Sequence, residues 1–372
     1  MHGAAGATHE ETLMRRALAL AKHGWGQTAP NPMVGAVVVR HGEVVGEGWH
    51  ERFGEPHAEV NALRAAGDRA RGATLIVTLE PCRHHGKTPP CTDAIIAAGL
   101  RRVVIGALDP GRASGGGAAL LREAGIEVDS GILAAASREL NAPFFHAQVS
   151  GYPWTTLKLA VSIETAISDA RGSTSHLTGP EARREVHLLR AGHDAIAVGI
   201  GTVLADDPQL TVREVRPPRI PLKRVVFDRA LRTPLESKLV QTTADAPTIV
   251  VTRTTSSSRV RELRAAGVDV IAAGDLAEGF FALREKGIRS LLVEGGATIA
   301  SAVLGHRLAH RLVIFQTPVA LGPRALHAFD GASPVVLSEL ENHPVLERKA
   351  LGRDVMTTYA LQSESSDVHG PG

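Results

Sequence analysis

TLEPCRHHGKTPPC, residues Thr78–Cys91, holds both cysteines of this 372-residue chain. A His-Ala-Glu triplet, His57 to Glu59, precedes it. A structural zinc site uses four protein ligands, whereas a catalytic one uses three and leaves the fourth position for water. One histidine and two cysteines supply three ligands, and Glu59 is left over as a proton carrier. We therefore predict a catalytic zinc site with the ligands His57, Cys82 and Cys91.

The local sequence places these residues at the ends of predicted elements. His57 and Glu59 lie at the start of a predicted helix, and Cys91 opens another after two prolines, where the helix dipole favours a thiolate. Cys82 follows a predicted strand, at the edge where parallel α/β sheets build their sites. Zinc lowers the pKa of bound water from about 15.7 to about 7. The pattern predicts attack on an amidine-like ring carbon, with Glu59 carrying the proton to departing ammonia, as in zinc nucleobase deaminases.

Composition narrows the class of protein. The length favours two domains, and 44% hydrophobic residues suffice for packed cores. The net charge of +2, the lack of a Lys/Arg block and an aromatic content of 3% argue against nucleic acid as a partner. No apolar run reaches the length of a membrane span, and the first ten residues do not resemble a signal peptide. We expect reduced cysteines and a cytoplasmic location.

Helical and strand patterns alternate in the first half of the chain, which predicts a largely parallel sheet covered by helices. Val34–Val39 and Glu43–Gly48 form a hairpin in this prediction, and the glycine-rich segment 111–117 a mobile loop. The other predicted elements are helices at Glu10–Lys22, Pro56–Ala66, Cys91–Ala98 and Ala118–Ala124 and strands at Ala73–Leu79, Arg102–Leu108 and Ile126–Asp129.

A boundary between two domains is predicted near Asn141–Pro153, giving domains at 10–147 and 148–365. The tail after Gln362 is rich in Ser, Asp and Gly and is predicted to be disordered. Predicted elements of the second half are strands at Thr155–Val161, Ala195–Gly199, Arg224–Asp228, Thr248–Thr252, Val268–Ala272 and Ser290–Val293, and helices at Pro180–Ala191 and Ala297–Leu304.

Several motifs resemble the bifunctional deaminase/reductase of riboflavin biosynthesis, the RibD family, over about residues 10 to 362. In the first half they are Asn31-Pro32-Met33-Val34-Gly35, Gly48-Trp49-His50, His57-Ala58-Glu59 and Glu80-Pro81-Cys82 through Cys91. The second half carries Leu157-Lys158-Leu159-Ala160, Val186-His187-Leu188-Leu189-Arg190, Gly199 through Pro208, Leu210-Thr211-Val212-Arg213 and Val293-Glu294-Gly295-Gly296.

The resemblance implies a cytidine-deaminase-like three-layer α/β/α domain followed by a dihydrofolate-reductase-like α/β domain. It implies zinc-dependent deamination of 2,5-diamino-6-(5-phosphoribosylamino)pyrimidin-4-one, then NADPH reduction of the ribosyl group, in a homo-oligomer (dimer or tetramer). The substrate-binding residues would be Asn31, His50, His84, Lys87, Thr174, Arg190, Leu210, Arg213 and Glu294. The NADPH-binding residues would be Ala160, His176, Thr202, Asp206, Gly296, Ala297, Thr298, Ile299, Ala300 and Ser301.

Four departures from the family pattern suggest an altered reductase. They are Ser162-Ile163-Glu164-Thr165 for Ser-Leu-Asp-Gly, His176 for Trp, Leu308-Ala309-His310 for Val-Asp-Glu, and Gly111-Arg112 where the family has Asn-Pro. A second reading is therefore a deaminase of a related heterocycle with a diverged or inactive reductase-like domain. A nucleic-acid deaminase lacks the basic clusters it would need, and a non-catalytic zinc scaffold would have no use for Glu59.

Overall fold

The computed structural model describes residues 7–170, 177–254, 256–331, 339 and 342–362. The chain divides into two compact units, Met1–Gln148 and Val149–Gly372. The predicted residues Thr174 and His176 lie outside the described residues. Within the described part, no helix is both long and apolar enough to cross a bilayer.

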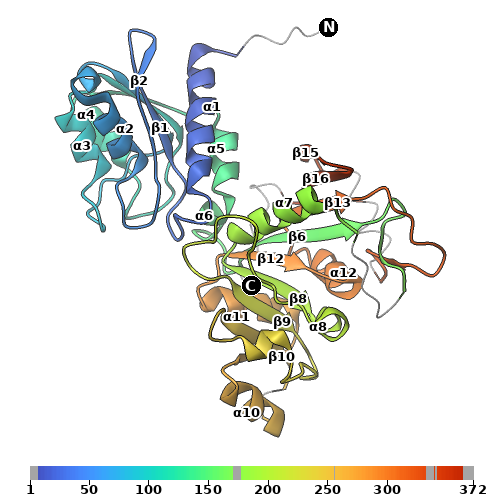
Figure 1. The fold of residues 1–372 in the computed structure, drawn as a ribbon. Helices are drawn as coiled ribbons and strands as arrows, with labels where there is room; N and C mark the ends of the chain where they lie inside the picture. The colour runs from blue at the N-terminus through green and yellow to red at the C-terminus, as the bar shows by residue number, and fades with distance from the viewer. Residues whose placement is uncertain (1–6, 171–176, 255, 332–338, 340–341, 363–372) are drawn as a thin grey trace. The chain divides into compact units, whose positions relative to one another are not determined.

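The first unit is built on a five-stranded sheet with the order β2-β1-β3-β4-β5. Figure 1 shows α1 and the β1–β2 hairpin of this unit in blue. The β1–β2 hairpin is present as predicted, but β1 also runs antiparallel to β3, so only β3, β4 and β5 are parallel. The strands are β1 (Gly35–Arg40), β2 (Glu43–Trp49), β3 (Thr74–Leu79), β4 (Arg102–Ala107) and β5 (Glu127–Ser130). The helices are α1 (His9–Ala21), η1 (Lys22–Gly24), α2 (Ala58–Ala66), η2 (Gly67–Ala70), α3 (Cys91–Ala97), α4 (Gly117–Glu123), α5 (Ala134–Leu140) and α6 (Ala142–His146).

The central strands β1, β3 and β4 carry nearly continuous buried runs, so both faces of this sheet are covered. Leu13 and Met14 of α1 pack with Val37 of β1 on one face. On the opposite face, α2, α3 and α4 pack with side chains such as Val38 and Val77. The three layers, helix on sheet on helix, place the carboxyl end of β3 and the start of α3 at the same edge.

The second unit has a nine-stranded sheet in the described residues, with the order β11-β10-β9-β8-β12-β6-β13-β16-β15. Strands from β11 to β13 are parallel, and β16 and β15 add an antiparallel end. Its strands are β6 (Trp154–Val161), β8 (Ala195–Gly199), β9 (Lys223–Phe227), β10 (Thr248–Thr252), β11 (Asp269–Ala272), β12 (Ser290–Glu294), β13 (Arg311–Gln316), β15 (Val345–Leu351) and β16 (Asp354–Ala360), with β7 (Ala166–Ser168) and β14 (Leu326–His327) forming a separate pair.

Helices cover both faces of the second sheet as well. Phe280 of α11 and Ile299 of α12 pack in one core cluster with Leu157 of β6. On the other face α8 and α10 pack on β8, β9 and β10, and α7 packs on β13 and β16. The helices are α7 (Pro180–Ala191), α8 (Ile200–Asp206), α9 (Lys238–Gln241), α10 (Ser258–Ala265), α11 (Leu276–Glu285) and α12 (Ala297–Gly305).

Departures from the family pattern have structural roles in this fold. The Glu164 carboxylate accepts hydrogen bonds from the Leu321 and Gly322 amides, at 2.7 and 3.3 Å. His310 Nδ1 accepts from the Thr155 amide at 3.0 Å, and its ring stacks on Trp154. These residues bind neighbouring backbone and rings within the fold.

Thr165, which stands at the glycine position of the Ser-Leu-Asp-Gly motif, is the departure that strains the backbone, because its φ is 64°. A β-branched residue in the left-handed region is strained by about 1–2 kcal/mol. We expect Thr165→Gly to raise the free energy of unfolding of the second unit by about 1 kcal/mol, since glycine's extra chain entropy offsets part of the relief. Scanning calorimetry measures the gain. Thr165→Ala is the control, because it keeps Cβ; equal stability of the Gly and Ala variants would contradict the strain argument.

Candidate functional site

The three predicted zinc ligands converge in the first unit. His57 directly precedes α2, Cys91 is the first residue of α3, and Cys82 follows the end of β3. His57 Nδ1 lies 3.2 Å from Cys91 Sγ and 3.6 Å from Cys82 Sγ, and the three ligand atoms lie within 4.8 Å of one another. Ligands at Zn–S and Zn–N distances of about 2.3 and 2.0 Å are about 3.5 Å apart in a tetrahedron. The donor set therefore fits zinc.

Electrostatics prepare these side chains for a cation. The Cys91 amide donates to Cys82 Sγ at 3.4 Å, and hydrogen bonding from the Cys91 side chain lowers the pKa of the Cys82 thiol to about 4. The hydrogen bond with Cys82 raises the pKa of His57. A thiolate hydrogen-bonded to an imidazole and to a second thiol offers a divalent cation three donors, and binding of the cation releases the protons that these side chains hold.

Glu59 lies in the first turn of α2 and is only 3% exposed. Its Oε2 has no hydrogen-bond partner within the described part of the chain. Burial raises the pKa of this carboxyl group to about 7, despite the opposing charge of His57. A carboxyl group that gains and loses a proton near neutral pH suits a general acid and base.

His50 and Asn31 join this cluster. The rings of His50 and His57 meet edge to face, with centroids 5.0 Å apart. His50 Nδ1 lies 3.3 Å from the Pro56 carbonyl, and its Nε2 lies 3.5 Å from Asn31 Nδ2. Burial and the charge of His57 lower the pKa of His50 to about 4, so it is neutral. A neutral ring that donates to Pro56 accepts from Asn31, which leaves the Asn31 carbonyl oxygen for another partner.

The other two predicted substrate residues of this unit lie in the loop between Cys82 and Cys91. The Lys87 ammonium stands 4.8 Å from the centroid of the Phe53 ring, a cation–π contact. His84 is exposed, and among the described residues no contact joins it to the zinc ligands.

Glu80, to which the sequence analysis assigned no role, organises the segment next to Cys82. Its carboxylate accepts from the amides of Asp109, Gly116 and Ala118, at 3.0, 3.1 and 2.8 Å. A side chain at Gly117 would lie 1.9 Å from the Pro81 carbonyl oxygen, so only glycine allows this approach. Glu80, which precedes Pro81-Cys82, therefore binds one amide inside the segment 111–117 that was predicted to be mobile and one amide on each side of it.

A cavity of about 870 Å³ marks the site of the second unit, at the carboxyl ends of β6, β8, β9, β10 and β12. Ten of the predicted substrate and cofactor residues line it: Ala160, Arg190, Thr202, Asp206, Leu210, Glu294, Gly296, Ala297, Thr298 and Ile299. Ala300 packs instead in the apolar core, and the Ser301 hydroxyl donates to the Asp330 carbonyl. The cavity is large enough for both a dinucleotide segment and a substrate.

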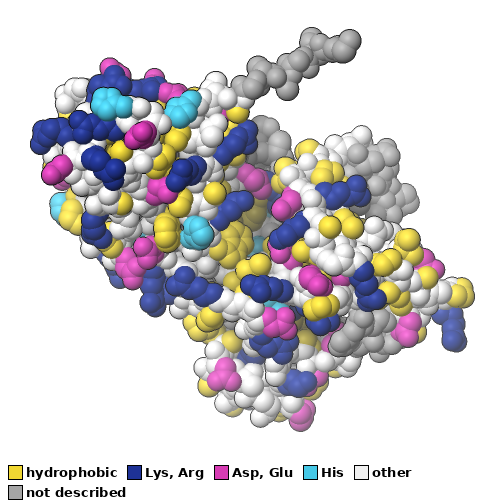
Figure 2. Space-filling model, turned by 45° about the horizontal axis from the view of Figure 1, so that its top comes forward, with side chains coloured by type: hydrophobic (Ala, Val, Ile, Leu, Met, Phe, Trp, Pro, Cys, Tyr) yellow, Lys and Arg dark blue, Asp and Glu magenta, His cyan; other side chains and the backbone are white. Residues whose placement is uncertain are grey.

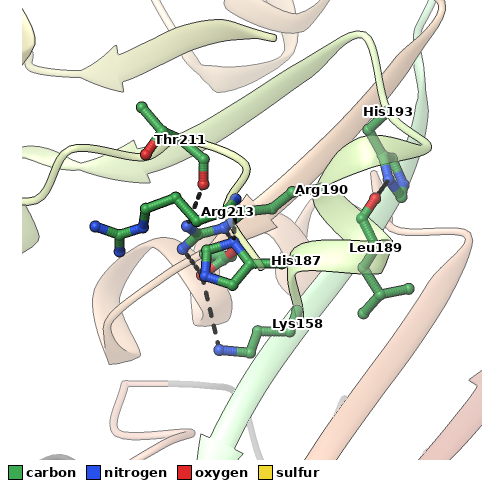
Figure 3. Close-up of polar contacts among 8 residues, drawn as sticks. Lys158, His187, Leu189, Arg190, His193, Thr211 and Arg213 are labelled. Carbon is green, nitrogen blue, oxygen red and sulfur yellow. Dashed lines mark hydrogen bonds and ion pairs between the residues drawn. The ribbon is translucent and has the colours of Figure 1, made fainter. Parts of the chain in front are cut away.

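Three charged residues that line this cavity, Lys158, Arg190 and Glu294, contact one another. Figure 3 shows Lys158 and Arg190 among their polar neighbours. Arg190 grips Glu294 with two hydrogen bonds, of 2.6 and 2.9 Å, and also donates to the Thr211 carbonyl. Lys158 Nζ lies 3.7 Å from Glu294. Burial alone would raise the pKa of Glu294, but the charges of Arg190 and Lys158 lower it to about 2. The carboxylate is therefore ionised between two cations.

Lys158 and His187 are site residues that the sequence analysis did not single out. Burial lowers the pKa of Lys158, which lies within the otherwise apolar run from Leu157 to Val161 of β6; a lysine at such a position was the available signal. His187 Nδ1 accepts from the Arg213 amide at 3.2 Å, and Arg213 Nη1 donates to Gln209. Arg213 is thus held beside the network, although it is not among the cavity-lining residues.

Comparison with known proteins assigns the two units. Residues 7–107 match the family model for the cytidine and deoxycytidylate deaminase zinc-binding region, and residues 153–351 match the RibD C-terminal domain. The riboflavin biosynthesis protein RibD of Aquifex aeolicus is 44% identical over 84% of this chain and 88% of its own length. The chain belongs to the RibD family. The RibD protein of Escherichia coli is 42% identical over 85% and 89% of the two chains.

Solved structures agree over nearly the whole length. Acinetobacter baumannii RibD has a TM-score of 0.82 at 36% identity, covering 95% of this chain and 98% of its own. A Thermotoga maritima protein, described as a diaminohydroxyphosphoribosylaminopyrimidine deaminase/5-amino-6-(5-phosphoribosylamino)uracil reductase, has a TM-score of 0.82 at 37% identity, covering 95% and 98%. The predicted family, fold class and bifunctional zinc- and NADPH-dependent enzyme are confirmed, and no comparison supports the alternative of another heterocycle.

Proposed function

We propose that the first unit deaminates 2,5-diamino-6-(5-phosphoribosylamino)pyrimidin-4-one to 5-amino-6-(5-phosphoribosylamino)uracil, and that the second unit reduces the ribosyl group of this product to the ribitylamino compound. The observation that carries the proposal is the buried carboxyl group of Glu59, whose Oε2 has no hydrogen-bond partner in the described residues, beside three convergent zinc ligands. Similarity over 95% of this chain to the Thermotoga maritima protein, which is named for both reactions, supports the pairing of the two units.

In the deaminase site, zinc held by His57, Cys82 and Cys91 would supply an activated water nucleophile. Glu59 would accept a proton from water and pass it to the departing amino group, which then leaves as ammonia; its near-neutral pKa allows both transfers. Asn31 contacts the polar edge of the pyrimidine, oriented by the neutral His50. Lys87 and His84, in the loop between the two cysteines, bind the phosphoribosyl portion, for which the Lys87 ammonium suits the phosphate.

In the reductase site, NADPH would supply the reducing equivalents. The cofactor side of the cavity is formed by Ala160, Thr202, Asp206 and the residues from Gly296 to Ile299. The start of α12 offers free backbone amides to a phosphate. Lys158, Arg190 and Glu294 hold the substrate end, where an ionised carboxylate between two cations fixes polar groups of the sugar. Arg213 binds the substrate phosphate, and Leu210 packs against the substrate.

The interspersed surface charge supports a small-molecule substrate. On the face shown in Figure 2, Lys and Arg side chains alternate with Asp and Glu and form no continuous basic field. Two cysteines without a disulfide support a cytoplasmic location. The edge strand β15, where Val345 and Leu346 are exposed, supports a homo-oligomer, because such edges pair readily with a second chain.

The decisive experiment follows both reactions in one cuvette. We expect zinc-loaded protein to release ammonia from the diaminopyrimidinone substrate and then to consume NADPH, seen as lost absorbance. Supplied with the aminouracil product instead, the protein should consume NADPH without releasing ammonia. Absence of ammonia release from the first substrate would overturn the deaminase assignment, and absence of NADPH turnover with the second would overturn the reductase assignment.

A further inference from the structure

Asn141 lies at the junction between α5 and α6, in the segment 108–152 that neither family model matches. It is 4% exposed. The backbone N–H of Asn141 donates to the Arg138 carbonyl at 2.9 Å. The backbone carbonyl of Asn141 accepts from the backbone amides of Phe144 and Phe145, at 2.8 and 3.1 Å. The backbone of Asn141 is therefore fixed on both sides.

The Asn141 side chain reaches a residue 108 positions earlier in the chain. Its Oδ1 accepts from the Met33 amide at 2.8 Å, and its Nδ2 donates to the Met33 carbonyl at 2.8 Å. Both backbone groups of Met33 are thus satisfied by one side-chain amide, as a neighbouring strand would satisfy them. Two parallel hydrogen bonds fix the direction of the backbone as well as its position.

Met33 belongs to the loop that carries Asn31. On the other side of this loop, the His50 amide donates to the Val34 carbonyl at 2.9 Å, and the Asn31 amide donates to Thr28 within the loop. The loop is therefore held between the residue that follows β2 and the Asn141 side chain. The Asn31 amide group consequently stands 3.5 Å from His50 Nε2, near the zinc ligands.

We infer that Asn141 is a positioning residue of the deaminase, which sets the pyrimidine-recognising Asn31 through the backbone of Met33. This inference rests on the proposed function, in which Asn31 contacts the pyrimidine. An apolar side chain would fill the same buried space, but it would leave the Met33 amide and carbonyl without these partners. Asn141 supplies both a donor and an acceptor with short reach, which suits the task of orienting a loop.

The test compares steady-state deamination by four variants. Asn141→Ala removes both hydrogen bonds, and Asn141→Asp keeps the acceptor for the Met33 amide but loses the donor for its carbonyl. Asn31→Ala removes the recognising side chain itself. Ser137→Ala is the matched control, because Ser137 is buried on α5, which ends just before Asn141, and its hydroxyl has no hydrogen-bond partner in the described residues.

We expect both Asn141 variants to raise KM for the diaminopyrimidinone about tenfold, the equivalent of one or two lost hydrogen bonds, with kcat changed less than about threefold. Zinc content and NADPH turnover on the aminouracil should match the wild type. Ser137→Ala should leave KM unchanged. A KM effect with intact zinc separates loop positioning from a general loss of structure, which lowers the active fraction and therefore kcat.

The outcomes distinguish failure of this inference from failure of the proposed function on which it rests. If Asn31→Ala raises KM but the Asn141 variants do not, the positioning role is overturned and the proposed function stands. If Asn31→Ala also leaves KM unchanged, both the role of Asn31 and the inference fail. Should Asn141→Ala not fold, Asn141→Asp decides alone: a raised KM with retained zinc supports the inference, and a fall in kcat at constant KM overturns it.

Discussion

Glu59→Gln will abolish ammonia release while the protein keeps its zinc. Gln has nearly the shape of Glu but neither accepts nor delivers a proton, and proton transfer by a positioned side chain contributes about 10²–10⁴-fold to the rate. Glu59 serves both the attacking water and the leaving ammonia in the proposed reaction, so we expect a fall in kcat of at least about 10³-fold. A continuous ammonia assay measures the rate, and elemental analysis measures the zinc.

Two controls isolate the chemistry. Glu55→Gln changes an exposed carboxylate four residues before Glu59 and should leave ammonia release near the wild-type rate. NADPH consumption on the aminouracil should be normal in Glu59→Gln, because that reaction needs no deamination. Wild-type ammonia release by Glu59→Gln would show that the reaction uses another proton carrier.

The zinc centre was predictable from sequence because its chemistry is concentrated in two short motifs. His57 and Glu59 share one helical turn, and the two cysteines bracket one loop. Asn141 and Glu80 escaped prediction because their partners are backbone groups far along the chain, which residue types do not reveal. A side chain that binds a backbone amide leaves no matching residue in the sequence.

The strands also divide into those that the sequence pattern predicts and those that it does not. Most of the predicted strands occur in the structure where an apolar run is buried on both faces, as in β3 and β12, whereas the predicted β5 is largely exposed. β15 (Val345–Leu351) was not predicted, and six of its seven residues are exposed, so no period-two apolar pattern marks it. β13, by contrast, carries the apolar run Leu312–Phe315 and could have been predicted as a strand.

Glu294→Gln will disable the reductase and weaken its unit. Arg190 and Lys158 are each buried against this carboxylate, and removing one partner of a buried charge network costs about 3–5 kcal/mol because the remaining charges lose their compensation. We expect NADPH turnover on the aminouracil to fall by at least about 10²-fold. Hydrogen exchange of the β6 and β12 amides should report the loss of stability.

The matched control is Glu185→Gln on α7, whose carboxylate pairs with the partly exposed Lys349 at 2.8 Å. Such pairs contribute about 1 kcal/mol or less, so this variant should keep both its turnover and its exchange protection. Equal protection in Glu294→Gln and Glu185→Gln would contradict the buried-network argument.

The pH dependence provides an independent check on Glu294. Its pKa is lowered from 4.5 to about 2 in the folded unit, so its contribution to stability is full above about pH 4.5 and is lost as pH falls toward 2. That shift corresponds to about 3 kcal/mol. Gln does not titrate, so the difference in free energy of unfolding between wild type and Glu294→Gln should shrink across this pH window. The other carboxylates occur in both proteins, so their titration cancels in this difference. A difference that stays constant from pH 6 down to about pH 3 would show that the variant acts through packing and not through the charge of Glu294.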